Sequence, residues 1–356
     1  MHRVMIQSAS YHNCRDAVDR AFELFPQEIA RKKVLIKPNV LRASAAEEHI
    51  VTHPALLRAV VEKVEELSPA EIVVGDNPGI FSYGDNENSF EKSGLMDATK
   101  GYYRNLGDTT QNLAFNPDFM PVVGVSKEIM EADIFISLPK FKTHGLTVMT
   151  GAIKNSYGIL PGAQKARLHQ LAGSPARFHD VIVEVFGLRV PDLFIMDAVV
   201  GMEGSGPASP ELRDIGLILA ADNGVALDGV VARMMGVDPA SLRFLQKATT
   251  MGLGSFDSQM TEIDGEMIVL SDFKLPPPLD SKATSGNPAN QEFLRTRTLL
   301  RPQADPELCT ACGACIDHCP VSALTMAETF PVVEAEICIT CFCCQEICPE
   351  KAMTLK

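Results

Sequence analysis

Two stretches decide the fold of the C-terminal part of the chain: CTACGACIDHCP at residues 309–320 and CITCFCCQEICP at residues 338–349. Each contains the run Cys-x2-Cys-x2-Cys-x3-Cys-Pro. Zinc sites usually supply their cysteines in pairs separated by a long gap, and disulfide frameworks are typical of small secreted chains. Three cysteines at this spacing followed by Cys-Pro fit the ligand run of a [4Fe–4S] cluster better. The sequence therefore predicts two such clusters in one small domain.

These runs resemble those of bacterial two-cluster ferredoxins, in which three cysteines of one run bind one cluster and the fourth binds the other. The resemblance implies two ligand sets, which are Cys309, Cys312, Cys315 and Cys348 for cluster 1 and Cys338, Cys341, Cys344 and Cys319 for cluster 2. Cys343 lies off this spacing and is predicted not to be a ligand. Cys14 is predicted to be a small buried side chain. Such clusters carry single electrons, and the alternative is that they only brace a domain with little core.

The 356-residue chain has a net charge of −13, and the charge is unevenly distributed. Residues 305–356 contain eight acidic and two basic side chains, so this segment alone carries −6. The acidity disfavours nucleic acid as a partner. It fits electrostatic steering towards a basic patch on a redox partner protein or ferredoxin, and it fits simple solubility equally well.

No stretch approaches the run of about 18 apolar residues that a membrane-spanning helix needs. Met1-His2-Arg3 leads directly into Val4 without the apolar core of a signal peptide. We therefore expect a cytoplasmic protein with no membrane span. The exposed clusters also suggest an anaerobic or low-oxygen host.

Short apolar runs alternate with amphipathic segments through residues 1–270, which predicts an α/β body with a mostly parallel sheet and flanking helices. The predicted strands are 34–36, 72–74, 134–136, 193–196 and 215–219, and the predicted helices are 55–67, 177–188 and 225–235. Residues 271–304 are rich in proline and predict a linker. Residues 305–356 are predicted to form a small α+β ferredoxin-like domain.

Polar side chains follow each of the predicted strands. In chain order they are Lys37 and Asn39, Asp76, Lys140 and Lys142, Asp197, and Asp222 with Asn223. In an open α/β sheet, ligands bind beyond the carboxyl ends of the strands. Five runs that end in such residues therefore predict a binding site at this edge, although each one alone is an ordinary turn or helix cap.

Residues 140–169 hold the densest set of basic groups and are predicted to form a long glycine-rich polar loop. Its candidate residues are Lys140, Lys142, His144, Lys154, Asn155, Lys165, Arg167 and His169. Cations in such a loop bind a carboxylate or a phosphate, and the alternative is a solvated loop. His53 follows Thr52, a plausible helix cap, and either faces the crevice or packs. Glu203 lies in a second glycine-rich loop that is neither a Walker A loop nor a Rossmann fingerprint.

Several of these segments resemble the family called domain of unknown function 362. They are KPN at 37–39, THP at 52–54, PKFKTH at 139–144, GAIKN at 151–155 and EGSGP at 203–207. Members of this family are often fused to a ferredoxin pair and are described as iron–sulfur-centre proteins. The resemblance implies a cytoplasmic redox protein of anaerobes and supplies no reaction.

A fainter resemblance is to the nickel-pincer lactate racemases, through TGAIK at 150–154, PG at 161–162 and His169. It implies that Lys154 anchors a pincer cofactor, that His169 ligates nickel and that His144 is a catalytic base. Gly151-Ala152 departs from the paired glycines of that family, and racemases need no ferredoxin domain.

Three functions remain open at this point. The first is an iron–sulfur oxidoreductase in which Lys140, Lys142 and Lys154 hold an anionic substrate or cofactor and His144 or His169 supplies protons. Asp76, Asp197 and Glu203 would then contact metal or hydroxyl groups. The second is a protein that donates electrons to mature another metalloenzyme, and the third is a pincer-type isomerase.

Overall fold

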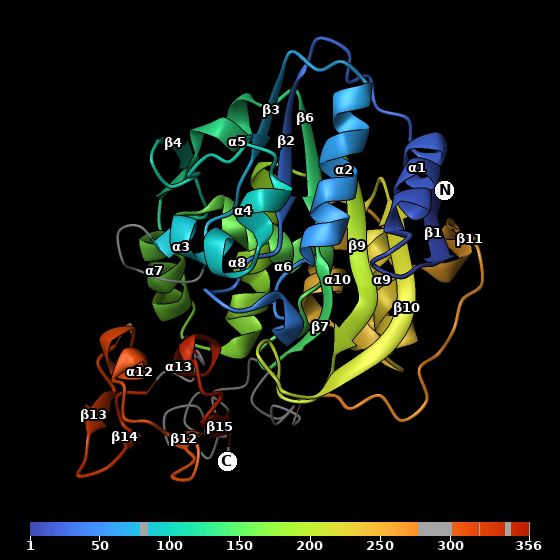
Figure 1. Ribbon diagram of the computed structural model, residues 1–356. Helices are drawn as coiled ribbons and strands as arrows, with labels where there is room; N and C mark the ends of the chain where they lie inside the picture. The colour runs from blue at the N-terminus through green and yellow to red at the C-terminus, as the bar shows by residue number, and fades with distance from the viewer. Residues whose placement is uncertain (79–84, 277–300, 320, 339–342, 356) are drawn as a thin grey trace.

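The computed structural model describes residues 1–78, 85–276, 301–319, 321–338 and 343–355. It contains an α/β body built on one large sheet and a small C-terminal module that packs against one end of the body (Figure 1). The module carries the cysteine runs. The predicted fold class is therefore confirmed for both parts. No helix in these described ranges is long and apolar enough to cross a membrane.

The central sheet has the strand order β11-β1-β10-β9-β6-β2-β3, and β7 and β8 extend it beside β9. Its strands are β1 His2–Ser8, β2 Lys33–Pro38, β3 Glu71–Val74, β6 Ile134–Leu138, β7 Lys140–His144, β8 Val148–Met149, β9 Leu193–Met202, β10 Leu212–Ala221 and β11 Thr261–Asp264. A separate hairpin pairs β4 Thr110–Ala114 with β5 Val122–Ser126. All the predicted strands are present.

Helices cover both faces of the sheet (Figure 1). They are α1 Cys14–Leu24, α2 Pro54–Glu66, α3 Asp85–Lys92, α4 Leu95–Ala98, α5 Lys127–Glu131, α6 Gly151–Asn155, α7 Gly162–Ala172, α8 Pro175–Leu188, α9 Gly224–Met234 and α10 Arg243–Thr250. The three predicted helices are confirmed within two residues at each end, as α2, α8 and α9.

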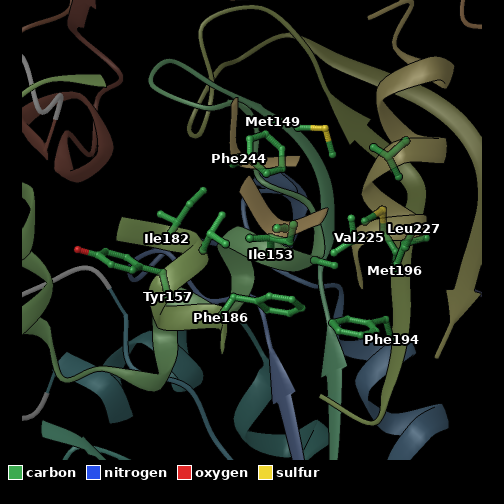
Figure 2. Packing of buried hydrophobic residues seen from close by; sticks show 14 of the residues in the cluster. Met149, Ile153, Tyr157, Ile182, Phe186, Phe194, Met196, Val225, Leu227 and Phe244 are labelled. Atoms are coloured by element: carbon green, nitrogen blue, oxygen red, sulfur yellow. The ribbon is translucent and has the colours of Figure 1, made fainter. Parts of the chain in front are cut away.

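The pleat of the strands divides the apolar side chains between two cores. Val34 and Ile36 of β2 pack towards α1 and α2, whereas Leu35 between them packs on the opposite side with α8 and α9. On α2, Leu56, Val60 and Val64 are fully buried, and each stabilises the fold by about 1.5–3 kcal/mol. Figure 2 shows the second core around Phe186 and Phe194, with Tyr157 at its margin.

The start of α2 corrects one prediction. Thr52 is not the helix cap, because His53 is the residue whose Nδ1 accepts a hydrogen bond from the Ala55 amide. Thr52 is buried, and its Oγ1 accepts from the Asn39 amide at 2.8 Å and donates to the Leu138 carbonyl at 2.6 Å. It therefore ties together the carboxyl ends of β2 and β6.

Strand β10 corrects a second prediction. It runs antiparallel to both of its neighbours, with Ile218 opposite Asp197 of β9. The residues that follow it therefore lie at the opposite edge of the sheet from the ends of β2, β3 and β6. There Asn223 caps α9 by accepting hydrogen bonds from Val225 and Ala226. Asp222 and Asn223 do not belong to the predicted site.

The module is built from three-residue strands and two short helices. They are β12 Pro302–Ala304, α12 Ala314–Asp317, β13 Leu324–Met326, β14 Pro331–Val333, α13 Cys343–Ile347 and β15 Met353–Leu355. Strand β12 pairs with β15, and β13 pairs with β14. Figure 1 shows α13 on the side of the module that faces the body.

The predicted linker has a structured segment at each end. Phe273 is buried and packs edge-on against Phe141 of β7, so residues 271–276 continue the body. Pro302–Ala304 is strand β12 of the module. Residues 277–300 lie outside the described part of the chain.

Candidate functional site

A crevice with about 790 Å³ of empty space, including its open mouth, lies between the carboxyl ends of the parallel strands and the module. Its walls come from β2, β7, α6, α7, α13 and the segments that follow β2 and β3. The polar groups that line it are Lys37, Asn39, Arg42, Asp76, Asn77, Lys142, Thr150, Lys154, Asn155, Lys165, His169, His318, Cys343 and Glu346. Parallel strands deliver their polar ends to one edge, which is why side chains far apart in the sequence meet here.

The floor of the crevice is a buried ion pair between Lys37 and Asp76, whose Nζ and Oδ1 atoms are 2.8 Å apart. Asp76 also accepts hydrogen bonds from the amides of Val40 and Asn77, each at 2.8 Å. Asn155 Oδ1 accepts from Lys37 Nζ at 3.3 Å and from Asn39 Nδ2 at 2.9 Å. Both carboxylate oxygens of Asp76 are therefore held within the protein.

Gly158 allows this floor to pack closely. A β-carbon at this position would lie 2.2 Å from Asp76 Oδ1 and 2.7 Å from Lys37 Nζ. These are contacts that atoms do not make, so a side chain here would separate the ion pair. Glycine has no β-carbon, so it allows the backbone of residues 156–159 to pack directly against Lys37 and Asp76.

The basic segment is not the loop that the sequence predicts. It folds as β7, β8, α6, a 3₁₀ turn at Ser156–Ile159 and α7. The weak apolar period misled the prediction, because the buried apolar side chains, such as Phe141, Ile153 and Leu168, are spread over several elements, most of them short, and polar contacts help to fix these elements in place. The amides of Ala152 and Ile153, for example, donate to the buried carboxylate of Asp228 at 2.6 and 3.0 Å, which caps α6.

Two lysines of β7 have different surroundings because the pairing of β7 with β9 shifts register between them. Lys140 Nζ lies 2.8 Å from Asp197 Oδ2, and both side chains are fully buried away from the crevice. Lys142 Nζ donates to the Ile50 carbonyl at 2.8 Å and lines the crevice. Burial, together with the neighbouring charge of Lys154, holds the pKa of Lys142 well below its ordinary value.

The tautomer of His169 follows from its contacts. Its Nδ1 lies 2.8 Å from the Lys165 carbonyl, which only accepts, so Nδ1 carries the proton. Its Nε2 is buried and has no hydrogen-bond partner among the described residues. Because the ring lines the crevice, it offers a lone pair there. Burial lowers the pKa of His169 to about 4, so the ring is neutral near pH 7.

Other buried polar atoms of the crevice also lack partners within the described residues. They are Asn39 Oδ1, Arg42 Nε and Thr150 Oγ1. Lys154 Nζ makes no hydrogen bond or ion pair there and lies about 6 Å from the rings of Tyr157 and Phe178. Buried polar groups are normally paired. This set of open donors and acceptors is therefore a place where a polar ligand fits.

The module forms the last wall of the crevice. His144 Nε2 lies 2.9 Å from Glu346 Oε1, and the amides of Leu146 and Thr147 donate to His144 Nδ1. The proton of His144 is therefore on Nε2, and the ring donates to Glu346. Gln345 Nε2 donates to the Ser205 carbonyl at 3.0 Å, so α13 contacts two segments of the body.

The predicted site residues His53, Lys140, Asp197 and Glu203 do not line the crevice. His53 stacks on Tyr11 with ring centroids 3.6 Å apart, and its amide donates to Asp197. Asp197 is inside β9 rather than at its end, and it binds Lys140 and Tyr11. Glu203 accepts from Arg213 and from the Lys274 amide, so it anchors a loop. Lys140 and Asp197 thus form a structural ion pair behind the crevice wall.

The module also contains a cavity of the right composition for an iron–sulfur cluster. Cys309, Cys312, Cys315 and Cys348 line about 330 Å³ of empty space. No three His, Cys, Asp or Glu side chains converge on one metal position in the described part of the chain. A cubane instead takes each cysteine at a different iron, so its ligands stand around a cavity. The four residues are the set implied for cluster 1.

The fourth cysteine of each run has the same local environment. Cys319 Sγ accepts the Ala323 amide, and Cys348 Sγ accepts the Ala352 amide, both at 3.2 Å. Amide hydrogen bonds to a thiolate sulfur tune the potential of a bound cluster. For cluster 2, Cys338, Cys344 and Cys319 lie in the module. Cys341 lies outside the described residues.

Comparison with known proteins agrees with this architecture. The family described as Domain of unknown function (DUF362) matches residues 34–233, and a 4Fe-4S dicluster domain matches residues 301–349. The chain belongs to the DUF362 family. The recognised family and the iron–sulfur module are therefore confirmed, and the chemistry of the DUF362 body remains to be inferred from the crevice.

Two further proteins resemble the DUF362 chain. It is 31% identical over 253 residues to the thylakoid-associated protein sll1697 of Synechocystis, and the match covers 68% of this chain and 76% of that one. A crystal structure of a Thermotoga maritima protein aligns with a TM-score of 0.41 at 12% identity, over 68% of this chain and 58% of that one.

The sequence prediction missed several crevice residues of the DUF362 protein. Arg42 and Asn77 lie just outside the segments singled out, Thr150 lies inside one of them but was not a candidate residue, and Glu346 is hidden among the cysteines of the second run. Glu346 occupies a position between Cys344 and Cys348 that no cluster geometry requires. An acid in that position could have been recognised, because Glu346 is the one charged residue of the sequence run 338–349.

The neutral state of His169 predicts a pH dependence of stability. Its folded pKa lies below the unfolded value of about 6.5, so between these values only the unfolded chain binds the proton. Stability is therefore lost as the pH falls, by about 1–2 kcal/mol from this group between pH 7 and pH 5. We expect His169→Asn, which keeps a donor for the Lys165 carbonyl, to flatten the curve of melting temperature against pH.

The control is His12→Asn, because His12 is an exposed histidine of the same chain. It should leave the slope of the curve unchanged. Identical slopes for the wild type and His169→Asn would contradict the buried neutral histidine.

Proposed function

We propose that this protein is an iron–sulfur oxidoreductase that passes single electrons to an anionic substrate or cofactor held in the crevice of the body. The observation that carries the proposal is the position of α13. This helix contains Cys344, an implied cluster 2 ligand, and it also lines the crevice through Cys343 and Glu346. The dicluster domain supports an iron–sulfur electron-transfer role.

The contacts of the module favour one order of electron flow. His318 and Cys343 line the crevice, and each is the chain neighbour of an implied cluster 2 ligand, Cys319 and Cys344. Cys312, an implied cluster 1 ligand, is exposed. This arrangement supports electron entry at the exposed side of the module and exit at the crevice. The acidic surface of the module supports a redox partner with a basic docking face.

The crevice residues have separable roles under this proposal. Lys154 and Lys142 attract the anion, and Lys154 has no competing partner among the described residues. Asn39 Oδ1 and Thr150 Oγ1 orient its polar groups. His169 accepts a proton at Nε2 or shares it with the ligand, because its Nδ1 proton is held by the Lys165 carbonyl. Burial favours these contacts, since it strengthens each charge–charge interaction.

A second candidate function is supported by the same histidine. Metal-binding histidines usually donate one ring N–H to a carbonyl and ligate through the other nitrogen, as His169 is arranged to do. A transition metal or a metal-bearing organic cofactor anchored near Lys154 would fit the pincer-type isomerase. In that case the module would serve as an accessory electron supply. A protein that only donates electrons to mature another metalloenzyme would not need these unpaired crevice atoms.

Elemental analysis of protein purified without oxygen separates these functions. We expect about eight irons per chain from two cubanes, and no other stoichiometric metal. Well under four irons in freshly isolated, intact protein would contradict the two-cluster basis of the proposal. Stoichiometric nickel or another transition metal would instead place the metal-dependent function first.

A further inference from the structure

The crevice contains two carboxylates in very different situations. Asp76 is engaged by Lys37 and by two backbone amides, so both of its oxygens are occupied. Glu346, which reaches in from the module, has a single hydrogen-bond partner among the described residues, His144. Asp76 is therefore a fixed part of the floor of the crevice. Glu346, in contrast, belongs to the module and enters the crevice from outside the body.

Glu346 is surrounded by cationic and polar groups of the body. It lines the same crevice as Lys142, Lys154, Lys165 and His169, which come from β7, α6 and α7. None of these four side chains forms an ion pair with it within 4 Å in the described residues. A carboxylate that lines the same crevice as these lysines, yet hydrogen-bonds only to the neutral ring of His144 among the described residues, lies where the anionic group of a ligand would lie.

Unpaired polar atoms that line the same crevice as Glu346 indicate which kind of ligand the crevice can bind. Arg42 Nε, Thr150 Oγ1 and His169 Nε2 are buried, line the crevice and lack partners within the described residues. They offer one donor, one hydroxyl and one acceptor beside the lysines. The sequence contains neither a Walker A loop nor a Rossmann fingerprint, so neither of these phosphate-binding motifs lines the crevice.

We infer that the crevice is a binding site for a small organic carboxylate and that Glu346 takes the place of its carboxylate when the ligand is absent. This inference rests on the proposed function, since it names the class of anion that the crevice takes. The ligand carboxylate binds against Lys142 and Lys154, and its remaining polar group reaches Thr150 and His169. Binding then displaces Glu346 and loosens α13, which Gln345 still holds through the Ser205 carbonyl.

The test is equilibrium binding of acetate to the anaerobic holoprotein, measured by calorimetry at pH 7.5. Glu346→Gln keeps an oxygen that accepts from His144 but removes the competing charge. We expect this variant to bind acetate at least tenfold more tightly than the wild type. Glu328→Gln, which removes an equal charge from an exposed turn of the module, is expected to match the wild type.

Each other outcome overturns a distinct statement. Equal acetate affinity in the wild type, Glu346→Gln and Glu346→Ala, with the affinity lost in Lys154→Ala, would remove the role of Glu346 and leave the anion site of the proposed function intact. Tighter binding of inorganic phosphate than of acetate by Glu346→Gln would overturn the carboxylate class. No binding of either anion by any variant would overturn the inference together with the anionic crevice.

Discussion

Replacing Cys344 with alanine is expected to lower the iron content from about eight to about four atoms per chain, because the variant loses one ligand of cluster 2. The module is sensitive to such a change. Its buried side chains are few, and Cys315, Cys344 and Cys348 are among them. A core of this size contributes little to folding, so ligand binding to metal contributes much of the stability of the module.

The matched control is the adjacent residue. Cys343→Ala removes the same sulfur one position away, on the same helix, and it should leave the iron content and the visible absorbance of the clusters unchanged. Iron analysis and absorbance of anaerobically purified protein measure both variants. Full iron content in Cys344→Ala, or an equal loss in Cys343→Ala, would show that the ligand assignment along this run is wrong.

Lys154→Ala is expected to have the second large effect, which is the loss of the crevice's activity with the clusters intact. Removing a buried charged partner of a ligand costs about 10- to 100-fold in affinity. The same lysine and Cys343 both line the crevice, and Cys343 is the chain neighbour of Cys344. The positive charge of Lys154 therefore stabilises the reduced state of the neighbouring cluster. We expect its loss to lower that cluster's reduction potential by an amount on the order of 50 mV.

A redox titration followed by electron paramagnetic resonance measures this shift without knowledge of the substrate. Iron content should stay at the wild-type level, which separates the charge effect from damage to the module. Lys127→Ala is a suitable control, because its side chain is about half exposed and pairs with Glu131 at the surface. A potential unchanged in Lys154→Ala, or shifted equally in Lys127→Ala, would contradict the position assigned to Lys154.

Much of the crevice could be predicted from the sequence, and the reason is topological. Lys37, Asn39 and Asp76 follow buried parallel strands, and such strands end at a common edge. The prediction failed for Asp222 and Asn223, because a strand's direction depends on its partners. An apolar run such as that of β10 looks the same in either direction, and only its pairing with β9 and β1 decides which edge its end reaches.

The direction in which a strand's side chains point could not be predicted from the sequence for a similar reason. Lys140 and Lys142 are two residues apart on one strand and would share a face of a regular sheet. The shift in register between them sends Lys140 to Asp197 and Lys142 to the crevice. Likewise, the basic segment looked like a loop because most of its elements are short, so that its buried apolar side chains, such as Ile153 and Leu168, form no long periodic stripe in the sequence.

The sequence by itself determined the cluster chemistry and the α/β class, because cysteine spacing and apolar periodicity are local properties of a chain. Only the tertiary structure decided that the module closes the crevice of the body. Glu346 meets His144 across 202 positions of sequence, and no local pattern encodes a contact of that kind. The proposed electron transfer from the clusters to the crevice ligand requires the module to pack against the body. That packing is set by the complementary shapes of the two surfaces.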